Sequence, residues 1–196
     1  QNQLDPSGES VIYLYGPAGT GKSHLLQASC HEPGAETIYL PLSDLRQYAA
    51  RDVLQGVENL DRICIDDIHV VLGDAKWEQA LFNLYNDARQ RGCRLVVAAD
   101  AAPRALAVNL EDLRSRLSWG IVYQLAQPED HDKEAILQFR ASRRGLTLRP
   151  SVASYIVSRA PRAMDQLLHV LETLDKASLA EKRSLSIPFV KEALGW

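Results

Sequence analysis

Long apolar runs, paired cysteines and an excess of basic residues are all missing from this chain of 196 residues. No apolar stretch approaches the roughly 18 residues that are needed to span a bilayer, so we expect no membrane segment and no membrane partner. The three cysteines are odd in number and contain no C-x-x-C pair. Such cysteines are typical of reduced thiols in a cytoplasmic protein, and not of disulfides or metal ligands.

The charge balance limits the kinds of partner. With a formal net charge of −3, the chain as a whole does not attract nucleic acid or anionic lipid, so any contact with DNA must be local or made through another protein. Because 46% of the residues are hydrophobic, the chain can bury a sizeable core without disulfides.

The sequence is organised around one run of eight residues, GPAGTGKS at positions 16–23, which fits the pattern G-x-x-x-x-G-K-[ST] without a mismatch. Glycines at these spacings let backbone N–H groups turn toward phosphate oxygens, while the lysine reaches the β/γ-phosphates and the last hydroxyl reaches Mg²⁺. We call this run the phosphate loop. The predicted nucleotide contacts are Pro17, Ala18, Gly19, Thr20, Gly21, Lys22, Ser23 and His24.

Short apolar runs that alternate with helical patterns predict a parallel α/β sheet up to residue 128. The five expected strands lie near residues 11–15, 37–40, 62–65, 95–99 and 121–125. After Pro128 the strand patterns stop, and helices are predicted near residues 130–144, 151–159, 163–180 and 188–194. We therefore predict a nucleotide-binding α/β subdomain at residues 1–128, opening with a polar lead-in over residues 1–10, and a helical lid at residues 129–196.

Two acids, Asp66 and Asp67, directly follow the third predicted strand. In P-loop NTPases a strand of this kind delivers one acid to Mg²⁺, and a neighbouring acid can polarise the attacking water. A strand that simply ends in a turn explains the same pair. The intact phosphate loop upstream favours the metal site.

Four blocks together resemble the AAA+ module of the DnaA family of bacterial replication proteins and, more closely, its regulatory Hda branch. They are GPAGTGKSHLL at 16–26, IDDI at 65–68, SRLSWG at 115–120 and IPFVKEAL at 187–194. The resemblance implies an AAA+ P-loop NTPase fold, with a five-stranded parallel sheet flanked by helices and a small C-terminal helical lid.

The resemblance also implies roles for the acids. Ser23 and Asp66 would hold Mg²⁺, and Asp67 would orient the water. Asp100, at the end of the fourth predicted strand, matches the first sensor of this family, which detects the γ-phosphate. A turn-forming residue before the loop 101–103 is the alternative for Asp100.

Arg116 matches the arginine that, in this family, enters the nucleotide site of a neighbouring molecule as a finger. An arginine favoured by the negative end of a helix is the alternative interpretation. Arg162 matches the second sensor, which reaches bound phosphates from the lid. We expect Arg162 in a first helical turn, where the positive end of the helix dipole disfavours a cation. Its presence there therefore indicates a further interaction, and an ion pair with Asp165 is the alternative to a phosphate contact.

A member of the Hda branch would carry ADP or another nucleoside diphosphate, with ATP as the other candidate, together with Mg²⁺. Working with the DNA-loaded sliding clamp, it would stimulate ATP hydrolysis by DnaA through Arg116, and it would form homo-oligomers. The clamp motif, Gln-Leu-x-Leu-Pro-Leu, is not found before the first strand, so we expect it upstream of Gln1. The chain stops at Trp196, where DnaA continues into a helix-turn-helix domain, so we expect no sequence-specific DNA binding.

Two other hypotheses remain at this point. A self-sufficient AAA+ ATPase, such as a DnaC-like helicase loader, would use the same acids to turn over ATP alone. A P-loop kinase fits less well, because no insertion for binding a phosphate acceptor is identifiable.

Overall fold

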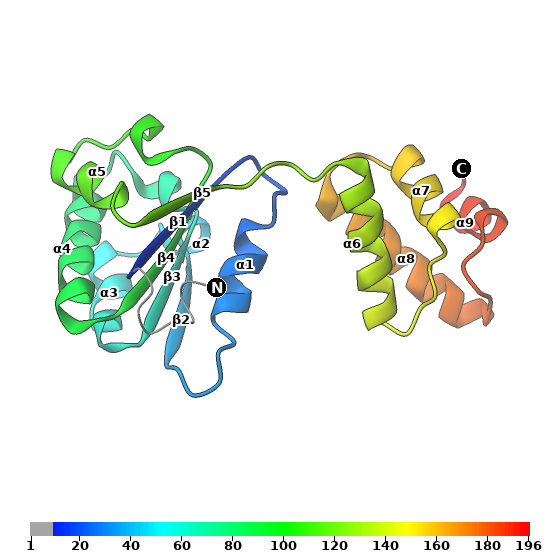
Figure 1. Ribbon diagram of the computed structural model, residues 1–196, viewed down its shortest axis with the longest axis horizontal. Coiled ribbons are helices and arrows are strands. Elements are labelled where there is room, and N and C mark those ends of the chain that lie inside the picture. Colours follow the sequence, from blue (N-terminus) through cyan, green and yellow to red (C-terminus); the bar gives the residue numbers. More distant parts are fainter. Residues whose placement is uncertain (1–9) are drawn as a thin grey trace. The chain divides into compact units, whose positions relative to one another are not determined.

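The computed structural model describes residues 10–196. Most of the expected polar lead-in, residues 1–9, lies outside the described part. The chain divides into two compact units, one that ends at Ala126 and one that spans Gln127–Trp196 (Figure 1). No helix within residues 10–196 is long and apolar enough to cross a membrane.

The first unit alternates strands and helices along the chain. Its strands are β1 (Val11–Tyr15), β2 (Thr37–Pro41), β3 (Arg62–Asp66), β4 (Arg94–Ala99) and β5 (Ile121–Gln124). Its helices are α1 (Lys22–Ser29), α2 (Leu42–Leu45), α3 (Ala50–Leu54), α4 (Ala75–Arg91) and α5 (Glu111–Leu117), with 3-10 turns η1 (Val57–Asn59), η2 (Ile68–Val71) and η3 (Pro103–Ala105).

The five strands form one parallel sheet in the order β2-β3-β4-β1-β5. Helix α1 lies on one face of this sheet, and α3, α4 and α5 lie on the other (Figure 1). Successive residues of a strand point to opposite faces, so each strand feeds two cores. On β4, Val96 and Ala98 pack with Leu26 of α1, whereas Leu95 and Val97 belong to the cluster that includes α4 and α5. The predicted five-stranded parallel fold is confirmed.

Burial on both faces explains the apolar character of the central strands. Every residue of β3 is buried, and so is every residue of β4 except Arg94. Parallel strands between helix layers have no solvated face, and their sequences are therefore nearly continuous apolar runs. The outer strand β5 is instead mostly exposed.

Two glycines let β1 and β5 come together. A Cβ atom on Gly120, which has φ +77°, would stand 2.2 Å from the backbone oxygen of Val11, and one on Gly16 would stand 2.3 Å from that of Leu125. Any larger residue would force the two strands apart, so the start of the phosphate loop depends on glycine packing as well as on turn geometry.

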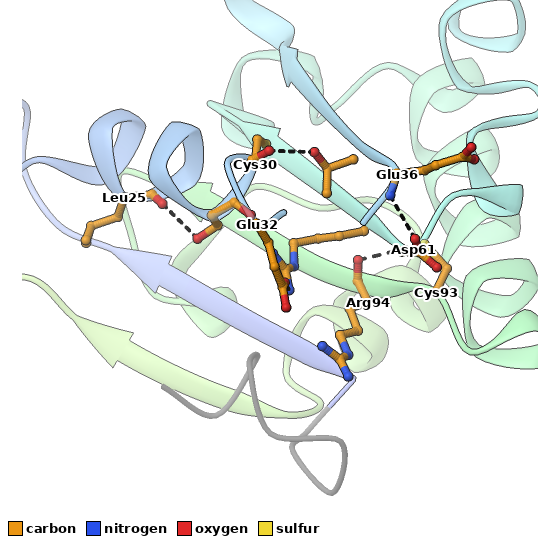
Figure 2. Close-up of polar contacts among 10 residues, drawn as sticks. Leu25, Cys30, Glu32, Glu36, Asp61, Cys93 and Arg94 are labelled. Carbon is orange, nitrogen blue, oxygen red and sulfur yellow. Dashed lines mark hydrogen bonds and ion pairs between the residues drawn. The ribbon is translucent and has the colours of Figure 1, made fainter. Parts of the chain in front are cut away.

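Polar contacts connect segments at the amino ends of the strands, which is the edge of the sheet opposite the phosphate loop (Figure 2). The Arg62 side chain, at the start of β3, is 2% exposed and pairs with Glu32 and the backbone oxygen of Ser29. The Glu36 N–H donates to the Asp61 carboxylate at 2.8 Å. These contacts attach the α1–β2 connection to β3, which fixes the end of α1 that lies farthest from the phosphate loop.

The second unit contains four helices: α6 (Asp130–Arg143), α7 (Pro150–Arg159), α8 (Met164–Glu181) and α9 (Ile187–Leu194). They enclose a core of their own, which includes Leu137, Ile156, Leu167, Leu171, Leu174 and Phe189. The apolar residues that repeat along α8 form the side of this helix that is buried in the core. One ion pair lies at each end of α6: Arg162, just before α8, is 3.6 Å from Asp130, and Arg144, just after α6, is 3.7 Å from Asp175 within α8.

Candidate nucleotide site

The phosphate loop connects β1 to α1 at the carboxyl edge of the sheet. Gly19 and Gly21 have φ of +80° and +89°, a left-handed conformation that glycine adopts at little cost. Gly21 is the N-cap of α1, and because glycine has no side chain, the helix begins without a side-chain partner for its first N–H groups. Free N–H groups at a helix start, together with the helix dipole, form a site for phosphate.

Lys22 lies inside the loop. Its side chain is buried, and Nζ donates hydrogen bonds to the backbone oxygens of Gly16 at 2.7 Å and Pro17 at 2.9 Å. A buried ammonium group is costly unless it is hydrogen-bonded, and these two carbonyls satisfy it. The positive charge is therefore held within the curve of the loop, where a phosphate would lie.

Asp66 ends β3 and is 1% exposed. Its Oδ2 accepts a hydrogen bond from the Tyr39 hydroxyl at 2.7 Å, and its Oδ1 accepts one from the Asp67 N–H at 3.0 Å. Burial has the larger effect on the pKa of this hydroxyl and raises it, whereas the nearby side chains of Gln27 and Ser23 lower it. The structure thus brings Ser23 and Asp66, the two predicted Mg²⁺ ligands, near the same hydroxyl group.

Tyr39 is a site residue that the sequence reasoning missed. Burial, followed by its hydrogen bond to Asp66, raises the pKa of Tyr39 to about 12. The hydroxyl therefore keeps its proton at neutral pH and acts as a donor. The signal lies in strand register: β2 pairs with β3, and Tyr39 is opposite Cys64, two residues before Asp66. That pairing is visible only once the strand order is known.

These residues fit a magnesium ion. Mg²⁺ prefers oxygen ligands, and it is usually held by one or two carboxylates plus waters and substrate phosphates. Within residues 10–196 no three His, Cys, Asp or Glu side chains gather as a protein cage for a metal. One buried carboxylate with one nearby hydroxyl, beside a phosphate loop, is the donor set expected of a metal that arrives with a nucleotide.

Asp67 adopts a left-handed conformation, with φ +53°, and is the N-cap of η2. Aspartate is among the few residues other than glycine that visit this region with any frequency. Such strain tends to concentrate at functional sites. Its predicted role in orienting water stays a prediction.

Asp100 follows β4, which lies between β3 and β1 in the sheet, so it shares the carboxyl edge with Asp66 and the phosphate loop. Its carboxylate is 57% exposed and lies 3.8 Å from Nε2 of His69, a neighbour that the sequence did not indicate. Burial and the charge of Asp100 raise the pKa of Tyr13, whose hydroxyl donates to the Ala101 oxygen at 2.8 Å. The sensor role of Asp100 stays a prediction.

Arg116 lies on α5, which packs against α4 on the face of the sheet opposite α1 (Figure 1). Its Nε donates to Oδ1 of Asn86 at 3.1 Å, and its guanidinium carbon lies 3.8 Å from the ring centre of Trp119 and 5.7 Å from that of Phe82. All these partners belong to the α4–α5 surface, and none to the phosphate loop. The structure does not bring Arg116 to the nucleotide site of its own chain.

Arg162 belongs to the second unit and precedes α8, which begins at Met164. The expectation that it lies in the first turn of the helix is therefore wrong. Its ion-pair partner is Asp130 at 3.6 Å, not Asp165, because α6 and α8 start side by side. The side chain is 81% exposed. Its predicted contact with the nucleotide stays a prediction.

Comparison with known proteins agrees with this geometry. A family model described as the bacterial DnaA ATPase domain matches residues 6–124, and one described as the Hda lid domain matches residues 130–194.

Solved structures of related proteins share the fold at low sequence identity. Domain III of the Thermotoga maritima replication initiator DnaA is 21% identical with a TM-score of 0.80, over 98% of this chain and 86% of that one. AMPPCP-bound DnaA from Aquifex aeolicus is 22% identical with a TM-score of 0.67, over 87% of this chain and 58% of that one. The T. maritima RuvB branch migration motor is 19% identical with a TM-score of 0.71, over 98% of this chain and 63% of that one. The chain therefore spans about three fifths of the longer relatives.

Proposed function

The chain belongs to the DnaA-related family of AAA+ proteins, and from this membership we propose that it is a nucleotide-bound regulator of replication initiation that stimulates ATP hydrolysis by DnaA. The observation that carries the proposal is the position of Arg116. It is held on the α4–α5 surface, away from the phosphate loop of its own chain. An arginine in this place serves a site on another molecule.

The contacts of Arg116 suit such a role. Asn86 holds Nε and the Trp119 ring supports the guanidinium plane, whereas the two terminal nitrogens have no hydrogen-bond or ion-pair partner among the described residues. A planar fork anchored at one nitrogen is already oriented, so little side-chain entropy is lost when its outer edge meets a phosphate. In related GTPases an arginine finger is worth about 10³ to 10⁵ in rate.

The nucleotide in the chain's own site acts as a structural ligand in this proposal. The phosphate loop and Lys22 would hold a diphosphate, and Ser23 and Asp66 would hold Mg²⁺, which would offset the negative charge of the phosphates. The AMPPCP complex of a related DnaA supports an adenine nucleotide. We propose ADP for the active form, with Arg162 as a further phosphate-binding residue.

The proposed partners follow from the same membership. The match to an Hda lid model over residues 130–194 supports DnaA as the protein acted upon, rather than a helicase. The DNA-loaded sliding clamp is the proposed co-activator. Contact of Arg116 with a neighbouring nucleotide site also requires an AAA+ assembly, which extends to homo-oligomers of this chain.

The test measures hydrolysis of DnaA-bound ATP in the presence of clamp and DNA, with wild-type protein and with Arg116→Ala. We expect the variant to lose about 1,000-fold or more of the stimulation, because arginine fingers are worth about 10³ to 10⁵ in rate. Arg91→Ala is the matched control, since Arg91 is a surface arginine near the end of α4 that bonds Asn59. Equal stimulation by wild type and Arg116→Ala would refute the proposal.

A self-sufficient ATPase is the second candidate, and one observation favours it: Asp66, Asp67 and Asp100 share the carboxyl edge with the phosphate loop. This candidate requires ATP turnover by the protein alone, abolished by Lys22→Ala. Binding of ATP without turnover would remove it.

A further inference from the structure

We propose that Tyr39 is a positioning residue for the magnesium site: its hydroxyl fixes the orientation of the Asp66 carboxylate, which together with Ser23 would hold Mg²⁺. The inference rests on the proposed nucleotide site and adds a residue from a strand, β2, that the phosphate-loop and acid motifs do not include. It follows from the hydrogen bonds, the burial and the charge around Asp66.

The Tyr39 hydroxyl lies between the two elements that carry the predicted Mg²⁺ ligands, α1 with Ser23 and β3 with Asp66. It donates to Oδ2 of Asp66 on β3 at 2.7 Å and lies near the side chains of Ser23 and Gln27 on α1. Its ring is partly buried and packs against the core between α1 and the sheet. The rigid side chain of Tyr39, which belongs to the neighbouring strand β2, therefore fixes the spacing between Ser23 on α1 and Asp66 on β3.

The groups that contact the Asp66 carboxylate leave room for a cationic partner. The carboxylate is 1% exposed, and its hydrogen-bond partners among the described residues are the Tyr39 hydroxyl and the Asp67 N–H, both of them neutral. Lys22 donates to loop carbonyls instead. A buried carboxylate whose hydrogen-bond donors are neutral groups lacks a cationic partner, and a divalent ion would supply one.

Loss of this orientation has a cost that a purely structural tyrosine would not show. Mg²⁺ requires nearly ideal octahedral geometry, and groups that orient a metal ligand typically change metal affinity by about 10- to 100-fold when they are removed. The phosphate loop, by contrast, makes its contacts from α1 and from its own backbone. Removing the hydroxyl should therefore weaken metal binding and leave metal-free nucleotide binding intact.

The experiment compares Tyr39→Phe with wild type in two measurements. Binding of a fluorescent ADP analogue in EDTA reports the phosphate loop, and binding of Mn²⁺ to the ADP-loaded protein, followed by electron paramagnetic resonance, reports the metal site. We expect the ADP affinity in EDTA to be unchanged and the Mn²⁺ affinity to fall about 10-fold. Tyr85→Phe is the matched control, because the Tyr85 hydroxyl lies on α4 and outside the site.

The outcomes separate this inference from the function on which it rests. Equal Mn²⁺ affinity in Tyr39→Phe and wild type would overturn the role of Tyr39 alone, as would a loss of ADP affinity in EDTA as large as the loss of Mn²⁺ affinity. Failure of the wild-type protein to bind ADP under any condition would instead overturn the nucleotide site itself.

Discussion

At the scale of single residues, Tyr85 and Tyr39 show how burial and hydrogen bonding separate two similar side chains. Both are tyrosines whose pKa is raised chiefly by burial, and Tyr39 has a carboxylate partner. The Tyr85 hydroxyl is buried and has no hydrogen-bond partner among the described residues. An unsatisfied buried hydroxyl costs stability, typically about 1–3 kcal/mol.

We therefore expect Tyr85→Phe to leave the free energy of unfolding unchanged or to raise it by about 1 kcal/mol. Removing the hydroxyl eliminates the desolvation cost while the ring continues to fill the core beside α4. Urea denaturation at neutral pH measures the difference. A loss of stability of 1 kcal/mol or more would show that the hydroxyl has a stabilising partner.

At the residue level, the sequence indicated the position of candidate site residues where the signal was local. The phosphate loop and the acids at the end of β3 carry their spacing within a few residues, and they lie at one edge of the sheet as the strand pattern implies. Tyr39 and the partner of Arg162 were missed because each depends on pairing between distant segments: β2 with β3, and α6 with α8.

At the scale of elements, Glu78 joins the helix α4 to the start of α5, which carries Arg116. Glu78 is 1% exposed, and its carboxylate accepts hydrogen bonds from the N–H groups of Gly73, Asn109 and Leu110 at 2.8 to 3.1 Å. Burial alone would raise the pKa of this carboxyl, but the three N–H donors and Arg114 outweigh it, and the net pKa is lowered. A charged acceptor thus fixes the loop before α5.

We expect Glu78→Gln to destabilise the protein by about 2–3 kcal/mol at neutral pH, because the amide NH₂ would face backbone N–H groups. The pKa of Glu78 is lower in the folded state than its ordinary 4.5, so its charged form adds stability above that pH, and this stability is lost as the pH falls through the folded pKa. The gap between wild type and variant should narrow below pH 4.5.

Denaturant titrations between about pH 3.5 and about pH 7 measure this gap. The range extends from roughly one unit below the ordinary carboxyl pKa to well above it. Glu111→Gln is the control, since Glu111 is an exposed glutamate on α5 whose ion-pair partner among residues 10–196 is Arg114 at 3.5 Å. A gap that does not change with pH would contradict the role given to the charge of Glu78.

At the scale of the whole molecule, the alternation of apolar runs and helical patterns predicted a parallel sheet followed by a helical region, and both are present. The order β2-β3-β4-β1-β5 could not be predicted from those patterns, because each helical crossover can place the next strand at several positions in a sheet. That order places Asp66 and Asp100 at the same edge of the sheet as the phosphate loop. Arg116 lies on α5, which covers the face of the sheet opposite α1 (Figure 1).

The central claim is that hydrolysis takes place in the site of DnaA, with this chain supplying Arg116 and using its own nucleotide as a structural ligand. Asp67→Asn separates the two sites, since asparagine tolerates the left-handed backbone at this position. It removes the carboxylate predicted to orient water in the chain's own site and leaves the α4–α5 surface unchanged.

The direct measurement is single-turnover hydrolysis of labelled ATP bound to DnaA, with clamp, DNA and ADP-loaded chain added as wild type, Asp67→Asn or Arg116→Ala. The account predicts that Asp67→Asn stimulates hydrolysis as wild type does and that Arg116→Ala does not. Loss of stimulation in Asp67→Asn, with stimulation retained in Arg116→Ala, would contradict it.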